Sequence, residues 1–423
     1  MIKSFSYKDN KLYCEKVSLE EVCKKVSTPF YLYSSKGIID NFSSLSSKLK
    51  GCNVLIAYAV KANSNISILR LVAKKGAGAD VVSYGELVRA IKAGIPGNKI
   101  VFSGVGKTDL EISKAIDHKI LQFNIESPQE LLTIEKIARE KKIKANISIR
   151  INPDVEAGGH PKISTGKKTD KFGISADEAL KLYKEASNYP WLNIVGVDMH
   201  IGSQVLHIKP FEKSFKKIER FCNKLESINI KIKNIDLGGG LGISYSDKKD
   251  VDITKDYTDL IKDMYHRTRK KIIIEPGRFI VANAGILVTR IIYKKKNERK
   301  NFIIIDAGMN DFLRPALYDA KHNVKQISTN PNKIESECFD IVGPICETTD
   351  VLKENANLDN KIKRGDFLFI DNVGAYGAAM SSTYNSRSLI PEILVNKNIF
   401  YKIRKKMKSD DFIKLEKIPD WLK

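Results

Sequence analysis

Cysteine, tryptophan and long apolar runs are all scarce in this sequence. Its 423 residues include six cysteines and two tryptophans, and the cysteines form neither a C-x-x-C pair nor an evenly spaced framework. This spacing argues against a disulfide scaffold, predicts no metal site and favours a reducing cytoplasm. The longest apolar run, around Phe279–Val288, is too short to span a bilayer. The polar start MIKSFSYKDN lacks the apolar region of a secretory signal. We therefore expect a cytoplasmic protein that does not bind membranes.

Acidic residues are also few relative to basic ones. The chain has 72 Lys+Arg against 50 Asp+Glu, a net charge of +22. Such an excess is typical of proteins that bind nucleic acid or membrane surfaces. However, the short basic runs Lys294–Lys296 and Arg404–Lys408 have no interleaved aromatic residues. We interpret the lysines as scattered over helical surfaces and expect no nucleic-acid partner, although an anionic substrate or cofactor would gain some electrostatic steering.

Short apolar runs alternate with amphipathic segments between residues 30 and 277. The runs are FYLYS, VLIAYAV, ADVVS, KIVFSG, LQFNI, ANISIRIN, IVGVDMHIG, KNIDLGGG and KIIIEPG. Their nearly unbroken hydrophobicity is typical of parallel strands that helices cover on both faces. Three of the amphipathic segments begin with the pattern of a capping box, at Ser83/Glu86, Ser127/Glu130 and Ser175/Glu178. Repeated units of roughly 25–35 residues predict a (β/α)8 barrel rather than an open doubly wound sheet, and we assign it to residues 27–278.

The pattern changes after Arg278. The segments FIVANAGILVTRIIYKKK, KNFIIIDAG, ECFDIVGPIC and DFLFIDNVGAY have no segment of helix length between them. They are typical of antiparallel strands joined by turns, and FSYKDNKLYCEKV near the start reads as a hairpin. We therefore expect a second domain, an antiparallel β-sandwich or β-barrel, formed by residues 1–26 and 279–423.

Chemically unusual residues stand at the ends of successive predicted strands, where the functional groups of a (β/α)8 barrel collect. They are Lys61, Arg150, His200 with Ser203, Gly238–Gly240, and Glu275–Arg278. One mouth of the barrel would then carry a lysine, an imidazole, a glycine turn and a carboxylate. This set suits covalent binding of a carbonyl cofactor that carries a phosphate.

Each of these features also has an ordinary structural explanation. A lysine at a strand end is usually solvated, a single histidine is more often a core residue, and EPGR can be a plain turn. DLGGGLG resembles a dinucleotide-binding motif, but position 243 is isoleucine where that motif needs glycine. A glycine turn that offers N–H groups to a single phosphate stays open. The ordinary explanations weaken when all the features occur in this order along one barrel.

The motifs of the chain resemble those of the fold-type III pyridoxal-phosphate decarboxylases. The resemblance covers almost the whole chain, through YAVKAN, HIGSQ, DLGGGLG, EPGR, RPALYDAKH, GPICETTD and DNVGAYGAAMSSTYN. It implies pyridoxal 5′-phosphate as the cofactor. Within the family, the chain is most similar to members that convert meso-2,6-diaminopimelate to L-lysine and CO2, the last step of lysine biosynthesis.

The resemblance also implies a role for each motif residue. Lys61 would bind the cofactor covalently, and His200 would stack on its ring. Glu275 would keep the ring nitrogen protonated, where racemases of this fold generally have an arginine. Cys346 would return a proton to the reacting carbon. The remaining cofactor contacts would come from Ser203, Gly238, Gly239, Gly240, Pro276, Gly277, Arg278 and Tyr376, and the substrate contacts from Arg278, Arg314, Tyr318, Glu347 and Tyr376.

The family pattern further implies a homodimer with shared active sites, in which Cys346 and Glu347 act on the neighbouring subunit. Arg278, Arg314 and Tyr318 suit a small amino-acid substrate with a distal carboxylate. Ornithine, arginine or a carboxylated polyamine is the alternative substrate, and relatives that use ornithine or arginine usually have aspartate where this chain has Glu347. A non-catalytic cofactor carrier built on the barrel alone would lack the second domain. No motif supports the remaining alternative, a basic nucleic-acid-binding protein.

Overall fold

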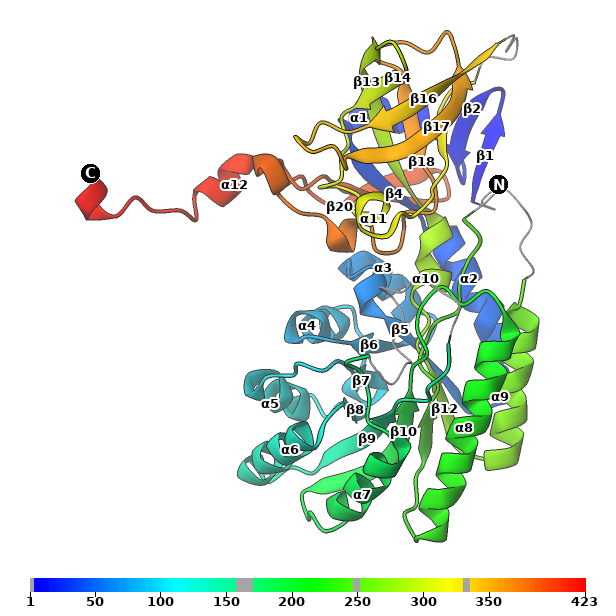
Figure 1. Cartoon of the computed structure of the whole chain (residues 1–423), viewed down its shortest axis with the longest axis vertical. Coiled ribbons are helices and arrows are strands. Elements are labelled where there is room, and N and C mark those ends of the chain that lie inside the picture. Colours follow the sequence, from blue (N-terminus) through cyan, green and yellow to red (C-terminus); the bar gives the residue numbers. More distant parts are fainter. Residues whose placement is uncertain (1–3, 157–169, 246–251, 330–334) are drawn as a thin grey trace. The chain divides into compact units, whose positions relative to one another are not determined.

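The computed structural model describes residues 4–156, 170–245, 252–329 and 335–423, which form two compact units. The first, which we call the barrel unit, consists of Ile39–Ser244 and Lys249–Ile280. The second, the sheet unit, contains the chain up to Ile38, Tyr245, and the chain from Val281 onward. Figure 1 shows both. None of the helices in the described part combines the length and apolar character needed to cross a bilayer.

Eight parallel strands close the barrel, which confirms the predicted (β/α)8 architecture. Their order around the barrel is β10-β11-β12-β5-β6-β7-β8-β9, with β9 paired to β10. Side chains such as Leu55, Ala57, Val101 and Ile273 pack together as one buried cluster. The strands are β5 (Val54–Ala59), β6 (Gly78–Val81), β7 (Ile100–Phe102), β8 (Gln122–Ile125), β9 (Ala145–Ile151), β10 (Leu192–Met199), β11 (Asn234–Asp236) and β12 (Lys271–Ile274).

Helices follow the strands, and serine caps begin several of them. Each predicted cap, Ser83, Ser127 and Ser175, accepts the N–H of the glutamate three residues on. In a strict capping box, the glutamate side chain also accepts the N–H of the cap residue. Glu86 instead accepts the N–H of Val82, one residue before the cap Ser83. A complete box forms instead at Thr108 and Glu111, which we did not predict. The helices are α2 (Ser35–Lys48), α3 (Ile66–Ala73), α4 (Tyr84–Lys92), α5 (Asp109–Asp117), α6 (Pro128–Lys141), α7 (Ala176–Ala186), α8 (Ile208–Ser227), α9 (Thr254–Thr268) and α10 (Arg278–Val281).

A nine-stranded, mostly antiparallel sheet forms the centre of the sheet unit. Its main path runs β17-β16-β14-β13-β4-β19-β20, while β15 pairs with β18 and β18 also pairs with β13. Two pairings, β14 with β16 and β4 with β19, are parallel. The strands are β4 (Phe30–Ser34), β13 (Gly285–Lys296), β14 (Asn301–Ile305), β15 (Val324–Gln326), β16 (Ser336–Val342), β17 (Val351–Asp359), β18 (Phe367–Ile370), β19 (Glu392–Asn396) and β20 (Ile399–Arg404).

The predicted N-terminal hairpin is present and packs on this sheet. Phe5 and Leu12 of the hairpin share a buried cluster with Phe369 and Ile393. The hairpin strands and the remaining helices of the unit are β1 (Phe5–Lys8), β2 (Lys11–Cys14), β3 (Val17–Ser18), α1 (Leu19–Lys25), α11 (Arg314–Tyr318) and α12 (Ser409–Ile413).

Two elements differ from the prediction. FYLYS, which we placed in the barrel, is β4, and it pairs with β13 and β19 of the sheet unit. All five of its residues are buried, and a fully buried strand gives the same apolar run in either sheet. The predicted start of the barrel at residue 27 therefore differs from the division of the units after Ile38. The segment after Arg278, predicted as a strand, first forms α10 and the 3-10 turn Ala282–Ala284.

Candidate functional site

The predicted site residues of the barrel unit lie at the carboxyl ends of its strands. Lys61 is in the 3-10 turn Val60–Ala62 that follows β5, and Asp80 is the third of the four residues of β6. The Lys61 Nζ atom lies 2.6 Å from Asp80 Oδ2. Asp80 is completely buried, while the Lys61 side chain is 37% exposed. The Lys61 side chain is thus paired with a buried carboxylate and remains partly exposed to solvent. Sequence reasoning missed Asp80, because ADVVS reads only as a buried strand.

His200 follows β10, and its protonation state can be read from one contact. The backbone N–H of Gly239 donates to His200 Nδ1 at 3.0 Å. An N–H can only donate, so Nδ1 carries no proton and the neutral ring has its proton on Nε2. Burial, followed by the positive charges of Arg150 and Lys61, holds the pKa of His200 well below its ordinary value. The ring is therefore flat, uncharged and fixed in direction.

Glycine is required in the turn that follows β11, for steric reasons. Gly238 has a φ of +64°, and a Cβ there would lie 2.5 Å from the Met199 carbonyl oxygen. A Cβ on Gly239 would lie 2.3 Å from the Glu275 carbonyl oxygen. A Cβ on Gly240, whose φ is +105°, would lie 2.8 Å from the carbonyl oxygen of Gly202. The turn is thus packed directly against the ends of β10 and β12, which a side chain would prevent.

Glu275 follows β12 and is linked to the same turn. Its N–H donates to the Gly238 carbonyl at 2.8 Å. The side chain is 5% exposed, and its Oε1 atom is buried without a hydrogen-bond partner among the described residues. Burial, followed by repulsion from neighbouring acids of which Asp236 is the strongest, raises the pKa of Glu275 well above its usual range. Lys61 offsets this only in part. Burial and the neighbouring acids therefore both favour the protonated form of this carboxyl group.

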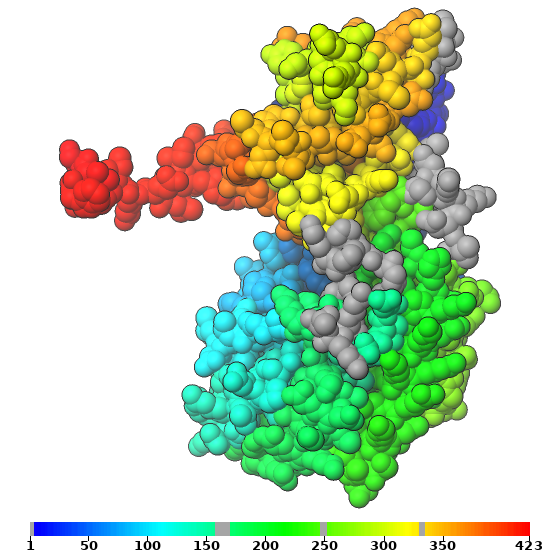
Figure 2. All heavy atoms as spheres, in the orientation of Figure 1, coloured from blue at the N-terminus to red at the C-terminus, as the bar shows by residue number. Residues whose placement is uncertain are grey.

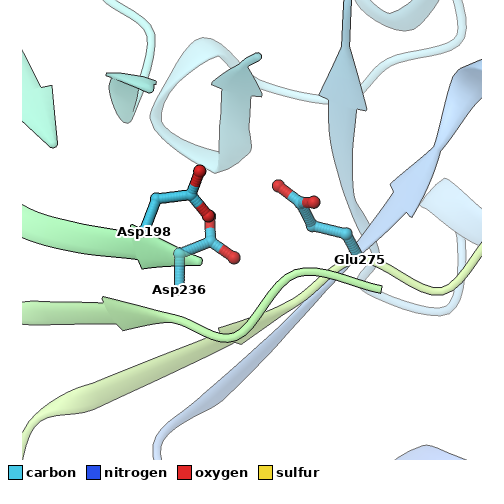
Figure 3. A group of neighbouring side chains, drawn as sticks. All are labelled: Asp198, Asp236 and Glu275. Carbon is cyan, nitrogen blue, oxygen red and sulfur yellow. The ribbon is translucent and has the colours of Figure 1, made fainter. Parts of the chain in front are cut away.

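Two more buried acids, which the sequence analysis did not single out, stand next to Glu275. Oxygen atoms of Asp198, Asp236 and Glu275 all lie within 4.8 Å of one another (Figure 3). Burial raises the pKa of Asp236 to about 7. Burial and the proximity of Asp236 raise that of Asp198. Asp236 accepts the N–H of Gly238 at 3.1 Å and therefore also braces the glycine turn.

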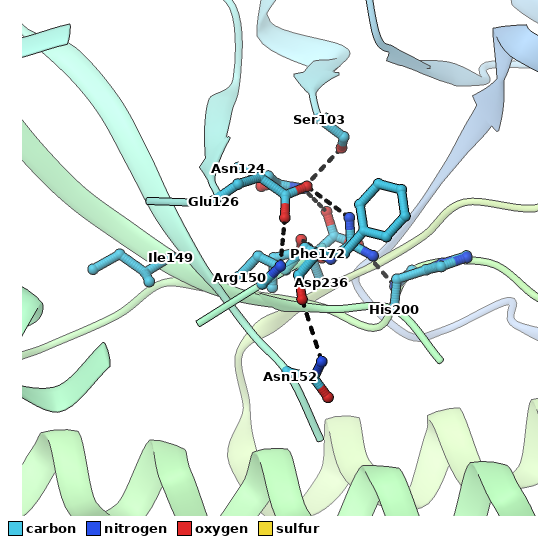
Figure 4. A network of polar contacts seen from close by, with 12 residues as sticks. Ser103, Asn124, Glu126, Ile149, Arg150, Asn152, Phe172, His200 and Asp236 are labelled. Carbon is cyan, nitrogen blue, oxygen red and sulfur yellow. Dashed lines mark hydrogen bonds and ion pairs between the residues drawn. The ribbon is translucent and has the colours of Figure 1, made fainter. Parts of the chain in front are cut away.

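Arg150 partly balances this negative charge (Figure 4). Its Nη1 atom donates to Glu126 Oε1 at 2.7 Å, and its Nε lies 3.9 Å from Asp198 Oδ2. Its guanidinium also stacks over the ring of Phe172 at 5.0 Å. The amide of Asn124 in turn links Asp236 and Ser103 through its Nδ2 atom. The floor of the barrel mouth is thus a connected polar network, not an isolated acid cluster.

The turn Pro276–Arg278 closes the ring of predicted residues. The Ala59 N–H donates to the Pro276 carbonyl at 3.3 Å. A Cβ on Gly277 would lie 2.9 Å from the Cβ of Ala62, so glycine allows this turn to touch the one that carries Lys61. Arg278 is 5% exposed and donates from Nη2 to Ser203 Oγ at 3.0 Å. The structure thus brings together every predicted cofactor contact of the barrel unit.

The sheet unit contains the predicted substrate residue Arg314 at the start of α11. It is 6% exposed, donates to the Tyr245 hydroxyl at 2.9 Å and lies over that ring at 4.9 Å. His322 fixes it from another side. The Nδ1 atom of His322 donates to the Asp371 carbonyl at 2.8 Å, so its Nε2 atom is free of a proton and accepts from Arg314 at 3.3 Å. Tyr318, at the other end of α11, is half-buried.

The loop between β16 and β17 presents Cys346, which is exposed. Its N–H donates to the Asn385 side chain at 3.0 Å. Asp350 closes the loop by accepting the N–H of Ile345 at 2.7 Å. Glu347 accepts the hydroxyl of Thr349 at 3.1 Å.

Two tyrosines remain to be placed in the sheet unit: Tyr376, which was predicted, and Tyr384, which was not. The hydroxyl of Tyr384 donates to Glu347 Oε1. Tyr376 is half-buried and has a φ of +57°, a conformation that is rare for a residue other than glycine. A thiol and a carboxylate thus stand side by side at the surface of this unit.

Known proteins resemble the chain over nearly its whole length. A family described as "Pyridoxal-dependent decarboxylase, pyridoxal binding domain" matches residues 35–282. The diaminopimelate decarboxylase of Aquifex aeolicus is 44% identical over 404 residues, which are 96% of this chain and 95% of that protein. The enzyme of the same name from Helicobacter pylori strain J99 is 45% identical over 397 residues, which are 94% of this chain and 97% of that protein.

Solved structures agree. Diaminopimelate decarboxylase from Helicobacter pylori, complexed with L-lysine, has a TM-score of 0.90 at 44% identity and covers 94% of this chain and 98% of its own. The M. jannaschii enzyme, also complexed with L-lysine, has a TM-score of 0.94 at 38% identity over 100% of this chain and 99% of its own. A lysine decarboxylase from Selenomonas ruminantium, at 23% identity and a TM-score of 0.81, shares the fold.

Proposed function

The chain belongs to the pyridoxal-dependent decarboxylase family, and from this premise we propose that it decarboxylates meso-2,6-diaminopimelate to L-lysine and CO2. Pyridoxal 5′-phosphate is its cofactor. The reaction takes place at the D-centre of the substrate. Cytoplasmic localisation fits this biosynthetic reaction.

The barrel unit fits the cofactor in three respects. The Lys61 side chain is paired with Asp80 and is 37% exposed, which suits a group that bonds to an incoming carbonyl. In the glycine turn after β11, the N–H groups of Gly238 and Gly239 already bind Asp236 and His200, so the Gly240 N–H and the backbone at the start of α10 would be the groups that meet a phosphate. Glu275 presents a buried carboxyl group whose Oε1 atom has no partner among the described residues. This last observation carries the proposal, because a buried carboxyl oxygen without a partner among the described residues suits a basic ring nitrogen.

The chain's own residues prepare the chemistry. Asp80 holds the Lys61 ammonium, and the neutral ring of His200 offers a flat face without adding charge. Glu275 would bind the ring nitrogen of the cofactor, where its carboxylate would favour the charged form of that ring. When bound, the cofactor supplies an electron-poor ring that accepts the electron pair left by the departing CO2. Cys346 then delivers a proton to the α-carbon through its Sγ atom.

Substrate selection follows from groups that suit a second amino-acid head. Arg278 and Arg314 each offer a planar fork for a carboxylate, and Tyr318 adds a hydroxyl. Glu347 can accept the distal ammonium. The contacts of Arg314 with Tyr245 and His322 support this role, because they hold the guanidinium in one orientation. Ornithine and arginine have no distal carboxylate and would leave such a fork unpaired.

The partner of this chain is a second copy. In the proposed homodimer, Cys346 and Glu347 of one chain complete the site around Lys61 of the other. The exposure of Cys346 supports this arrangement, because a proton donor buried in its own unit could not reach another chain.

Two assays test the proposal. The purified protein should be yellow, and borohydride should abolish the visible absorbance by fixing the cofactor to Lys61. It should release CO2 from meso-diaminopimelate much faster than from ornithine or arginine. A colourless protein that cannot bind added cofactor would contradict the proposal.

Subunit mixing tests the shared site. Lys61→Ala and Cys346→Ala chains are each expected to be inactive, whereas the mixture should recover part of the activity through hybrid dimers. Complete inactivity of properly folded heterodimers would contradict sharing and leave the reaction itself untouched.

A further inference from the structure

The last fifteen residues of the chain expose an unusual amount of apolar surface. We call Ser409–Lys423, which begins with α12, the arm. All its residues except Ser409 and Phe412 are exposed. Figures 1 and 2 show it leading away from β20. Its exposed large side chains are Ile413 at 60%, Leu415 at 79%, Ile418 at 68%, Trp421 at 81% and Leu422 at 60%.

The arm cannot owe its structure to its own helices. Its elements are the five-residue helix α12 and the three-residue turn Asp420–Leu422. Isolated helices shorter than about 12–15 residues are marginal in water. Only its base is attached to the sheet unit, where the Ser409 hydroxyl donates to the Ser386 carbonyl at 2.9 Å. A partner surface would account for its exposed apolar side chains.

The area available matches an interface between two copies. The five exposed side chains offer on the order of 700 Å² of surface. A specific interface of standard size takes about 800 Å² from each partner, and a two-fold dimer contributes two arms.

The charge of the arm also favours a second copy of the chain over nucleic acid or an anionic membrane as its partner. The arm has four acidic and three basic side chains within a chain of net charge +22, and the basic run Arg404–Lys408 ends just before it. A segment that bound nucleic acid or an anionic membrane would be basic. An arm that is nearly neutral instead avoids repulsion from the basic surface of another copy.

The barrel unit also exposes large apolar side chains. Four exposed residues follow the carboxyl ends of three successive strands, and we call them the rim. Ile66 begins α3 after β5, Val82 follows β6, and Val105 and Leu110 follow β7. Their exposed fractions are 38% for Ile66, 38% for Val82, 42% for Val105 and 60% for Leu110. The four rim residues and the five large side chains of the arm are all solvent-exposed.

We propose that the arm of one chain docks on the rim of a second copy and holds the dimer together. This inference rests on the homodimer of the proposed function and adds the segment that secures it. Trp421 is the expected anchor, because large aromatic side chains contribute most at interface centres. The rim belongs to the same barrel edge as Lys61, so docking would place the two-fold contact beside the shared site.

Sedimentation velocity of the full-length holoprotein tests the inference. Leu415→Asp and Trp421→Asp change the arm, and Leu110→Asp changes the rim. Each should raise the dissociation constant of the dimer by about 100-fold or more, since a charge replaces a buried apolar anchor. Leu132→Asp in α6 and Tyr293→Asp in β13 are matched controls at sites that are 47% and 54% exposed, and should leave the dimer unchanged.

A crosslinking experiment identifies the surface that the arm contacts and the chain to which that surface belongs. The photoreactive p-benzoylphenylalanine replaces Trp421 in a mixture of ¹⁴N- and ¹⁵N-labelled chains, and mass spectrometry reads the products. Peptides that join a light and a heavy chain near Leu110 are expected. Crosslinks confined to one chain, or dimers indifferent to the arm and rim changes, would overturn the inference. The visible absorbance of the bound cofactor separates the two proposals, because a wild-type protein that binds none would contradict the proposed function whatever its association state.

Discussion

The carboxylate of Asp80 lies 2.6 Å from the ammonium of Lys61. The register of the barrel explains this pair, since Asp80 on β6 stands beside Ala59 on β5, and Lys61 follows two residues later. Asp80 is fully buried, whereas the Lys61 side chain is partly exposed. A buried carboxylate can thus hold the amine in place without blocking its approach to a carbonyl group.

Replacing Asp80 with asparagine should impair the enzyme more than it impairs the fold. Asn has nearly the same shape but cannot pair with an ammonium, so Lys61 loses its fixed position. We expect kcat to fall by about 10–100-fold and cofactor affinity to weaken, as measured by CO2 release and by absorbance titration. Asp117→Asn is the control, because Asp117 forms an equally short but exposed pair with Lys141. Normal kinetics in Asp80→Asn would show that the pair has no positioning role.

Glu275→Gln should change the pH dependence of stability in the cofactor-free protein. The folded-state pKa of Glu275 is raised, so its stabilising contribution is complete below the unfolded pKa and is lost as pH rises through the folded value. Asp236, whose pKa rises to about 7, adds the same trend between about pH 4 and pH 7. Stability of the cofactor-free protein should therefore fall from pH 5 to pH 8, and Glu275→Gln should fall less steeply.

Thermal unfolding at both pH values measures this effect. Glu140→Gln, at an exposed position of α6, should follow the wild-type slope. The same Glu275→Gln substitution should lower kcat by about 100-fold or more, since glutamine cannot give a proton to the ring nitrogen. A wild-type slope in Glu275→Gln would mean that this carboxyl is not protonated in the folded protein.

Gly238→Ala should destabilise the fold far more than Gly51→Ala, although both glycines have a positive φ. Both Gly238 and Gly51 have positive φ, at +64° and +90°, but a Cβ at Gly51 meets nothing within 4 Å. We expect Gly51→Ala to cost about 1 kcal/mol of unfolding free energy and Gly238→Ala about 3 kcal/mol or more. Chemical denaturation measures both costs, and cofactor absorbance should be lost only in Gly238→Ala. Equal costs at the two positions would show that the close approach to Met199 is unimportant.

Arg314→Lys should weaken substrate binding and leave the cofactor in place. Lysine keeps the charge but loses the planar fork and the stacking over Tyr245. We expect KM for meso-diaminopimelate to rise by about 10–100-fold, with the cofactor absorbance unchanged. Arg267→Lys, which alters an exposed pair with Glu219, should leave KM unchanged. A drop in kcat alone would place Arg314 in the chemical step and contradict a role in binding the distal carboxylate.

Much of the architecture could be predicted because it depends on local periodicity. Buried parallel strands and capped helices leave patterns that can be counted, and eight of the nine apolar runs formed the barrel. The ninth, β4, could not be assigned, since its burial is equally complete in the other sheet. The helical turn of α10 was missed because FIVANAGILV is apolar except for Asn283 and continues into β13. Asp80, Asp198 and Asp236 were missed because each lies within an apolar run, and only the barrel shows which acids converge.

The sequence by itself determined the alternation of strands and helices, the change of texture after Arg278, and the motif residues at the strand ends. These follow from side-chain chemistry and short-range spacing. The tertiary structure alone decided which groups meet: the proton left on His200 Nε2 by the Gly239 contact, the carboxyl of Glu275 surrounded by other acids, and the pairing of Asp80 with Lys61. Such contacts join residues distant along the chain, and their energies depend on the burial that only the closed barrel creates.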